Sequence, residues 1–277
     1  MIPVILRLGP ITIYSYGLMM AIGFITGDFL LTRECRRRGI TTDYANGIVV
    51  WGAIGGIAGA RIYDVFDNWQ AYAGHPWSIV FSGAGFVWYG GFMGGLTAAA
   101  IVSRYYKVPI LRSFDMCAPA LILGQAFGRI GCLLSGDGDW GMPSTLPWAM
   151  AYPNAIVGWN SRTVLKLDPN GNLVSGFFPG VRVHPAPIYE SILYTAIFCY
   201  MWSIQKKAPE GRLLCLYLIL EGLARFMVEF VRVNQRIAFG LSEAQLISLF
   251  MIVVGLALWY ATTPRSSAVA EPSAMRA

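Results

Sequence analysis

Apolar stretches close to the length of a bilayer crossing recur along this chain, and they limit what it can fold into. A helix needs roughly 20 mostly apolar residues to span the hydrocarbon core of a membrane. We count seven such stretches, near residues 14–32, 46–66, 86–104, 113–135, 187–205, 212–231 and 242–262. Charged residues make up only 13% of the chain, against roughly 25% in a soluble domain. The sequence therefore predicts an all-α membrane protein with about seven transmembrane helices.

The distribution of Lys and Arg predicts how the chain sits in the membrane. The loops around 33–38, 104–112 and 206–212, together with the C-terminal tail, carry most of the basic residues outside the apolar stretches. The positive-inside rule places that side in the cytoplasm, so the N-terminus is expected to be periplasmic and the C-terminus cytoplasmic. The net charge of +6 is explained by this topology, and we expect no nucleic-acid partner.

A long polar segment interrupts the apolar pattern. Residues 136–186 are rich in Gly, Pro and Asn, and we expect them to form a small periplasmic head inserted in a transmembrane domain of residues 1–262. Residues 263–277 have the composition of a disordered cytoplasmic tail. The N-terminus has no basic region followed by a cleavage site, so we expect no cleaved signal peptide.

The five cysteines indicate neither a disulfide framework nor a metal site. Four lie in apolar stretches and Cys35 in a basic loop, so we expect reduced thiols. No CxxC or CxxxH spacing occurs and the chain has only two histidines, so we expect no metal and no cofactor. Asp137-Gly-Asp139 leaves one alternative open, because two such carboxylates can bind a divalent cation.

Several charged residues lie inside the apolar stretches, where a charge needs a partner or a function. Glu221, Arg225 and Glu229 follow one another at intervals of four, which places them on one face of a helix. They indicate a polar stripe facing an interior cavity, or else a ladder in which the three charges neutralise each other. Arg129 stands between glycines at the end of the fourth stretch, where its planar fork of donors suits a lipid phosphate; the alternative is an Arg that snorkels to the interface.

Three further patterns have plain structural interpretations. Arg61 and Asp64 are predicted to form an ion pair near a helix end, and His184 to anchor the chain at the interface by a hydrogen bond, although a role as a base stays open. Glycine pairs spaced by four predict close packing of helices in lipid. The pairs are Gly52/Gly56, Gly55/Gly59 and Gly91/Gly95.

An ordered set of short motifs resembles the prolipoprotein diacylglyceryl transferase family over about residues 9 to 260. The motifs are Tyr16-Gly17-Leu18-Met19, Gly59-Ala60-Arg61-Ile62, Tyr89-Gly90-Gly91, Gly128-Arg129-Ile130-Gly131, the turn 136–141 with Pro147-Trp148-Ala149-Met150, His184-Pro185 with Tyr189-Glu190, and the segment 222–230. The resemblance implies a seven-helix enzyme of the bacterial inner membrane. It implies transfer of the diacylglyceryl group of phosphatidylglycerol to the lipobox cysteine of a preprolipoprotein, so the expected partners are the bilayer, that lipid and lipobox peptides.

The resemblance also implies roles for residues at matching positions. Arg129 and Arg225 are expected to hold the phosphate and stabilise the transition state, with Glu229 orienting Arg225 and Asp137 holding the turn beneath Arg129. Tyr16 and Arg61 match positions that shape the lipid cavity. Gly141 and His184 complete the expected substrate-binding set.

Three positions depart from the family pattern. Tyr89 replaces a frequent His, Cys132 a frequent Asn, and Glu221 a frequent Tyr. A phenol is a poor base at neutral pH, so we expect Tyr89 to position the substrate and Glu221 or a lipid phosphate oxygen to take the thiol proton. The departures leave two alternatives open, a divergent paralogue with another lipid or acceptor and an inactive lipid-binding scaffold. The intramembrane charges leave a transporter as a third.

Overall fold

The computed structural model describes residues 1–263 apart from 10, 71–87, 158–164, 168–172 and 176–181, and within this part the chain is mostly helical. Its α-helices are α1 (Ser15–Arg38), α2 (Thr42–Asp67), α5 (Trp88–Tyr105), α6 (Ile110–Ser135), α7 (Ala186–Ile204), α8 (Arg212–Val228) and α9 (Glu243–Thr262). One lies at each predicted apolar stretch. Four of them, α1, α2, α6 and α9, are long and apolar enough to cross a membrane. The predicted tail, 263–277, lies outside the described residues except for Thr263.

The local sequence determines where several helices begin and end. Ser242 and Gln245 form a reciprocal capping box at the start of α9, which satisfies two backbone N–H groups that a helix leaves free. Gly136 follows α6 with a φ of 64°, a left-handed conformation that glycine adopts without strain. The start of α8 is capped from another helix, because Asp115 Oδ1 of α6 accepts hydrogen bonds from Leu213 N at 2.8 Å and Leu214 N at 3.2 Å.

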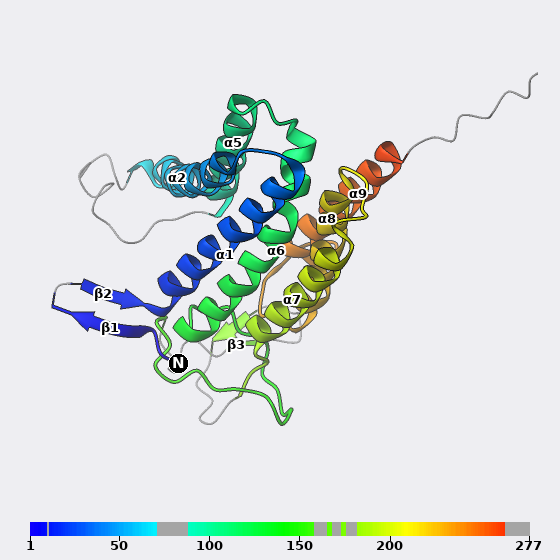
Figure 1. The fold of residues 1–277 in the computed structure, drawn as a ribbon. Coiled ribbons are helices and arrows are strands. Elements are labelled where there is room, and N and C mark those ends of the chain that lie inside the picture. Colours follow the sequence, from blue (N-terminus) through cyan, green and yellow to red (C-terminus); the bar gives the residue numbers. More distant parts are fainter. Residues whose placement is uncertain (10, 71–87, 158–164, 168–172, 176–181, 264–277) are drawn as a thin grey trace, which may run out of the picture.

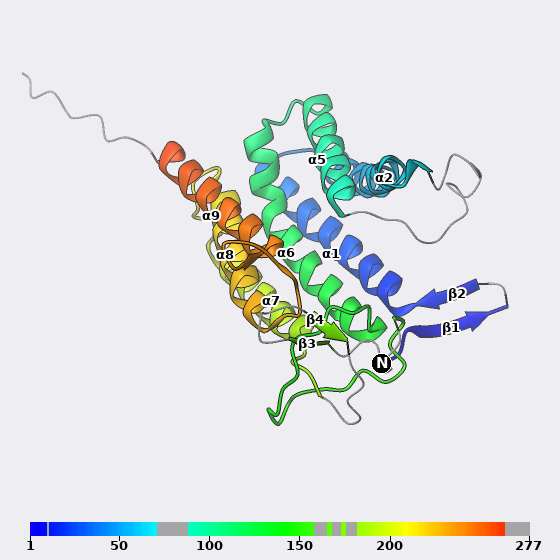
Figure 2. The same cartoon turned by 180° about the vertical axis from the view of Figure 1, so that it is seen from behind.

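The helices form a main bundle and an attached pair (Figures 1 and 2). In the bundle α6 lies against α1, α7 and α8, and α9 packs on α8. The pair consists of α2 and α5, whose backbones touch at Gly55, Gly59, Gly90 and Gly94. A Cβ on Gly55 would lie 2.7 Å from the carbonyl oxygen of Gly94, so only glycine permits this approach. The predicted close packing of helices through small residues is confirmed here.

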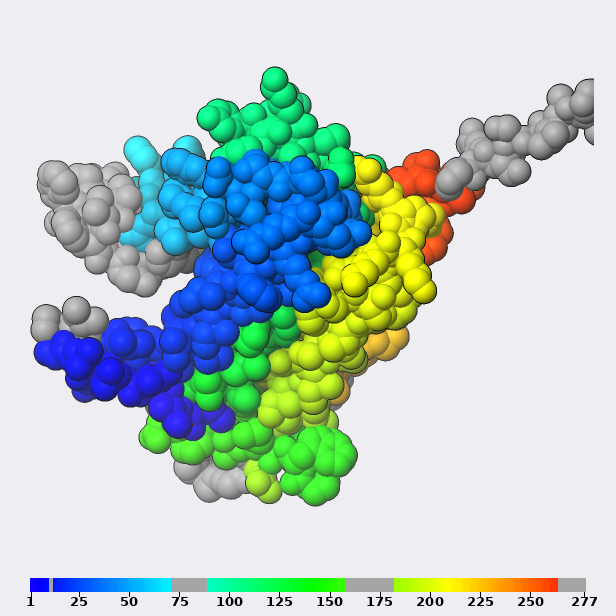
Figure 3. All heavy atoms as spheres, viewed as in Figure 1, coloured from blue at the N-terminus to red at the C-terminus, as the bar shows by residue number. Residues whose placement is uncertain are grey.

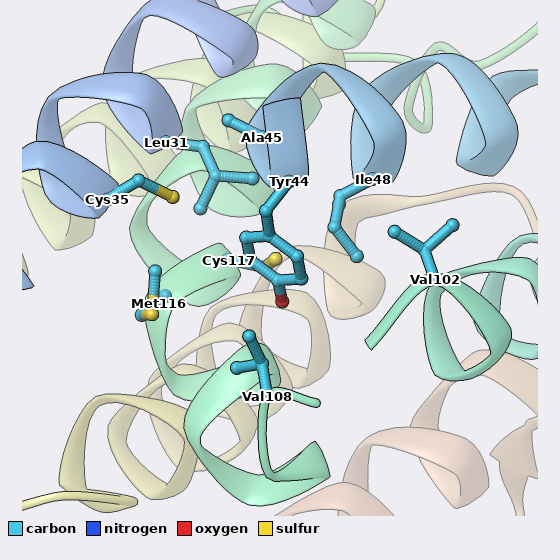
Figure 4. Packing of buried hydrophobic residues seen from close by; sticks show 9 residues of the cluster. All are labelled: Leu31, Cys35, Tyr44, Ala45, Ile48, Val102, Val108, Met116 and Cys117. Atoms are coloured by element: carbon cyan, nitrogen blue, oxygen red, sulfur yellow. The ribbon is translucent and has the colours of Figure 1, made fainter. Parts of the chain in front are cut away.

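A buried cluster joins the pair to the bundle (Figure 4). Tyr44 of α2 lies in its centre, with its hydroxyl group donating a hydrogen bond to Ser113 Oγ of α6 at 2.6 Å. The surrounding hydrophobic residues are Leu31, Cys35, Ala45, Ile48, Val102, Val108, Met116 and Cys117. Many large apolar side chains elsewhere on the helices are exposed, among them Phe29, Phe66 and Phe250, as expected for helices that face lipid.

Short antiparallel hairpins accompany the helices, which the expectation of an all-α protein did not include. They pair β1 (Val4–Leu8) with β2 (Ile11–Tyr14), β3 (Leu165–Leu167) with β4 (Leu173–Ser175), and β5 (Arg236–Ala238) with β6 (Leu241–Ser242). The β1–β2 hairpin projects from the bundle on the same side as α2 (Figure 3). In the described part of 136–186, Trp140, Tyr152, Ala155 and Val183 form a small core of their own beyond the end of α6.

Candidate functional site

Oppositely charged side chains from three helices meet where α6, α7 and α8 lie together. Glu190 of α7 joins the two arginines that the sequence singled out: its Oε2 lies 2.8 Å from Arg129 Nε, and its Oε1 accepts a hydrogen bond from Arg225 Nη1. Arg225 Nη2 also lies 3.1 Å from Glu229 Oε2. The two arginines are thus held side by side through one carboxylate.

Two residues beyond these helices complete the cluster. Asp139, in the turn after α6, accepts from Arg129 through Oδ2 and from Arg232 Nη2 through Oδ1, the latter at 2.6 Å. Arg232 follows the short 3-10 helix η1 (Glu229–Val231) and lies 3.6 Å from Glu190 and 3.7 Å from Glu229. We call the whole set the charge network: Arg129, Asp139, Glu190, Arg225, Glu229 and Arg232.

The charge network is balanced in charge, and three of its members, Glu190, Glu229 and Arg232, are buried. It contains three guanidinium groups and three carboxylates, and Glu190 and Glu229 are 0% and 1% exposed. Glu229 Oε1 also accepts hydrogen bonds from Asn234 Nδ2 at 2.6 Å and Ser242 Oγ at 2.7 Å. Removing buried charges from water costs several kcal/mol per ion, so each carboxylate here depends on its cations. Asp139, with 30% of its side chain exposed, is the most accessible carboxylate of the set.

Glycines allow the backbone to bring these groups together. A Cβ on Gly131 would lie 3.1 Å from Tyr16 Cδ2, so the Tyr16 ring of α1 packs directly against α6 beside Arg129. Gly141 has even less room, since a Cβ there would lie 2.5 Å from the carbonyl oxygen of Val231 and 2.7 Å from His184 Cβ. Gly141 N donates to His184 O at 2.8 Å. The turn after α6 is thereby fixed to the start of α7 and to the end of η1.

The two aspartates of the turn have opposite electrostatic environments. Burial raises the pKa of Asp137, and its Oδ1 accepts a hydrogen bond from Asp139 N at 3.3 Å, which stabilises the turn. Burial also acts to raise the pKa of Asp139, but Arg232 and Arg129 outweigh it and lower that pKa to about 2. Asp139 is therefore a stable anion at neutral pH, and the carboxylates around Arg232 raise the pKa of that guanidinium in turn, against the effect of its burial.

The alternative of a cation site at Asp137-Gly-Asp139 has a geometric counterpart. Ligand atoms of Cys132, Asp137 and Asp139 lie within 4.8 Å of one another, which is the one such group among the residues that the structure describes. Both oxygens of Asp139 are, however, bound by arginines. A cation would have to compete with two guanidinium groups for that carboxylate.

Glu221 lies near the charge network without joining it. Its carboxylate is buried, 7% exposed, and accepts a hydrogen bond from Tyr194 Oη at 3.4 Å. Within the described part of the chain, the other carboxylate oxygen, Oε2, has no hydrogen-bond partner. Among the same residues, Glu221 forms no ion pair with Arg225. The predicted three-charge ladder is therefore present only in its second half, between Arg225 and Glu229.

The other predicted site residues lie outside the charge network. Tyr89, at the start of α5, donates a hydrogen bond from its hydroxyl group to Glu243 of α9, the neighbour of Ser242. Arg61 forms the predicted ion pair with Asp64, at 3.6 Å in α2. His184 Nδ1 lies 3.2 Å from Tyr189 Oη, so it takes part in a hydrogen bond as an anchor would.

From the sequence alone, Asp139 is considered only as half of a cation-binding pair, and Glu190 and Arg232 have no assigned role. Glu190 stands in one of the family motifs, and a Glu in an apolar stretch is the same signal that identifies Glu221. Arg232 continues the pattern Arg225, Glu229 at helical spacing, and this signal was available too. That these residues meet depends on the contacts among α6, α7 and α8, which spacing along one helix does not reveal.

Comparison with known proteins identifies the family of this chain. Residues 3–261 match the family model described as prolipoprotein diacylglyceryl transferase. Proteins named phosphatidylglycerol--prolipoprotein diacylglyceryl transferase are similar throughout: that of Clostridium tetani is 32% identical over 92% of this chain and 95% of its own length. Those of Gloeobacter violaceus and a Nostoc species are 31% and 32% identical, over 93% and 92% of this chain and 92% and 87% of their own lengths. The chain therefore belongs to the prolipoprotein diacylglyceryl transferase family.

Proposed function

We propose that this protein transfers the sn-1,2-diacylglyceryl group of phosphatidylglycerol to the thiol of a lipobox cysteine in a preprolipoprotein. The products are a thioether-linked lipid and glycerol phosphate. Family membership supports the reaction type, and the relatives' names supply the lipid and the acceptor. The observation that carries the proposal is the pair Arg129 and Arg225, joined by the buried Glu190, because a departing phosphate needs fixed cations.

The reaction breaks the bond between the glycerol carbon and a phosphate oxygen and forms a carbon–sulfur bond. The thiolate attacks in line with the leaving phosphate, which departs with the electron pair of the broken bond. Arg129 and Arg225 stabilise the charge that develops on the bridging oxygen, and Glu229 keeps Arg225 oriented. Tyr16 and Arg61 shape the cavity for the lipid, and Asp137, Gly141 and His184 hold the turn that carries Asp139.

Since the charge network is already neutral, an arriving phosphate competes with its carboxylates for the arginine donors. Asp139 is the most accessible one, and it engages both Arg129 and Arg232. We propose that the lipid phosphate enters here and replaces Asp139 as the partner of Arg129. Glu190 and Glu229 stay in place behind the guanidinium groups, because both are fully buried.

We assign the thiol proton to Glu221 or to an oxygen of the lipid phosphate, with Tyr89 positioning the substrate. The free, buried Oε2 of Glu221 supports this assignment. If Glu221 is the acceptor, Glu221→Gln should abolish transfer, whereas Tyr89→Phe retains it at equal expression. If both variants retain transfer, the acceptor is the phosphate oxygen. If Glu221→Gln kept full activity while Tyr89→Phe lost it, the tyrosine would be the base.

For the topology we propose seven transmembrane helices in the bacterial inner membrane. The N-terminus and the head 136–186 are then periplasmic, and residues 263–277 form a cytoplasmic tail. The position of a helix at every apolar stretch supports the number of spans, and the distribution of Lys and Arg supports the orientation. In this arrangement the charge network lies toward the periplasmic end of the bundle, where the secreted acceptor and the lipid meet.

Transfer to a lipobox peptide by the purified chain tests the proposed reaction. The purified chain, incubated with phosphatidylglycerol and a lipobox peptide, should add the mass of a diacylglyceryl group to the peptide cysteine and complement a strain depleted of its own transferase. Arg129→Ala and Arg225→Ala should each abolish both results. No mass shift with a well-folded preparation would overturn the proposal and leave a lipid-binding scaffold; a shift with a different lipid or acceptor would identify a divergent paralogue.

A further inference from the structure

A second group of cations lies at the end of the bundle opposite to the charge network. Tyr16, next to Gly131, places the charge network beside the first turn of α1. Arg33 and Arg37 lie in the last turns of the same helix, roughly five turns further along. Lys206 follows the end of α7. These cations therefore take no part in the site described above.

The cations border a pocket of about 380 Å³ between the ends of α1 and α7. Its lining consists of Arg33, Glu34, Arg37, Trp202, Gln205 and Lys206. The one acidic residue, Glu34, is buried and already bound by Arg37 and Arg38, each at 2.5 Å. The pocket thus keeps an excess of positive charge from Arg33 and Lys206.

Donors in this pocket are free to bind a ligand. The guanidinium of Arg33 lies over the Trp202 ring, 5.3 Å from its centroid, and makes no ion pair within the described part of the chain. A cation–π contact of this kind leaves the N–H groups of the guanidinium available to other acceptors. The Gln205 side chain also forms no hydrogen bond with a described residue, although the residue is only 5% exposed. Arg33 and Gln205 thus line the same pocket with donors.

We propose that this pocket binds the phosphate group of an anionic phospholipid. A phosphate offers several acceptor oxygens to the Arg33 fork, and its charge balances Arg33 and Lys206. Free phosphate has the same chemistry, but the surroundings favour a lipid. Phe29, one turn before Arg33 on the same side of α1, is 64% exposed, and the Phe198 ring lies against Trp202 on α7. Acyl chains would cover these rings, and basic pockets between membrane helices are known to accept such headgroups.

The test counts lipids on the full-length protein. Native mass spectrometry follows a titration of the detergent-solubilised chain with phosphatidic acid, comparing wild type, the double variant Arg33→Gln/Lys206→Gln and the control Arg36→Gln. Arg36 is exposed and does not line the pocket. The double variant should bind lipid at that site with an affinity about 30-fold weaker than wild type. It should therefore carry one bound lipid fewer at the same lipid concentration. Equal lipid counts and affinities in wild type and double variant would overturn the proposal.

Two further measurements separate the possible explanations. Inorganic phosphate at the same concentration as the lipid should not displace it; displacement that depends on Arg33 would show that the site takes soluble phosphate and overturn the assignment to a lipid. Transfer to a lipobox peptide at saturating phosphatidylglycerol should be unchanged in the double variant. If that variant fails to fold, Lys206→Gln alone should weaken binding about fivefold, and unchanged binding would reject the site.

Discussion

Glu190 is the residue on which the geometry of the charge network depends most directly. It touches all three arginines and is fully buried. Without its charge, Arg129 and Arg225 would repel each other in a medium that screens charges poorly. The separation of Arg129 and Arg225 therefore depends on a fully buried carboxylate.

Glu190→Gln keeps the shape of this side chain and removes its charge. We expect transfer to fall by about 100-fold or more, as when one fixed donor is lost from a catalytic site, and stability to fall by about 3–5 kcal/mol, because a buried pair loses one partner. Initial rates with a lipobox peptide and unfolding in detergent measure the two effects. Glu210→Gln, at an exposed position outside the charge network, is the matched control. Wild-type activity of Glu190→Gln would contradict this role.

The two aspartates of the turn after α6 predict different responses to acid. The pKa of Asp139 is about 2, below its ordinary value, so its contribution to stability is complete above about pH 4 and is lost as the pH falls toward 2. Burial raises the pKa of Asp137, so its charged form is disfavoured in the folded state. Protonation of Asp137 in acid therefore stabilises the folded state relative to the unfolded one.

Asp139→Asn should therefore lower the Tm at pH 7 and remove the part of the acid-induced decrease between about pH 4 and pH 2. Asp137→Asn should leave the Tm at pH 7 unchanged or raise it. Thermal unfolding in detergent from pH 2 to 7 measures both. Identical pH profiles for Asp139→Asn and wild type would show that the ion pairs of Asp139 do not stabilise the folded state.

Arg129 and Arg225 could be predicted from sequence, whereas Arg232 and most of the acidic partners were not. Arg129 and Arg225 stand out because a charge inside an apolar stretch is costly. Glu229 was found because it shares a helix face with Arg225. Glu190 and Asp139 are partners across the tertiary structure, and no local spacing connects them to Arg129.

At the scale of elements, the α2–α5 pair is held by direct backbone contacts between glycines. The helices are so close at Gly59 that a Cβ there would overlap the carbonyl oxygen of Gly90. We expect Gly59→Ala to force the helices apart and to destabilise the protein by about 1–3 kcal/mol. Gly52→Ala on the same helix, where a Cβ meets no atom within 4 Å, should be neutral or slightly stabilising. Unfolding in detergent compares them; equal stability of the two variants would mean that the helices adjust at little cost.

The positions of the helices could be predicted because apolar stretches of this length have few alternatives. The hairpins could not: β5 and β6 contain Arg236–Ala238 and Leu241–Ser242, too few residues for an alternating pattern. The packing of α2 against α5 also could not be predicted from the sequence. Glycines at a spacing of four indicate a close contact, but they do not identify the partner helix.

At the scale of the whole molecule, the proposed topology places the head and the tail on opposite sides of the membrane. In a cysteine-free background that retains activity, Thr145→Cys in the head should react with an impermeant maleimide added to spheroplasts. Ser266→Cys in the tail should react only after the membrane is permeabilised. Labelling of both positions from the same side would require an even number of crossings between them, where the proposed topology has three.

The cap that Asp115 provides for α8 has a consequence for chain length. Asp115 fixes the start of α8 to α6, and Glu190 joins Arg129 and Arg225 further along the same two helices. The segments between these two contacts, 115–129 of α6 and 213–225 of α8, therefore lie side by side and are joined at both ends. Inserting one residue in either segment would rotate all residues after it by about 100° about the helix axis. Natural insertions and deletions among homologues should therefore fall outside both segments.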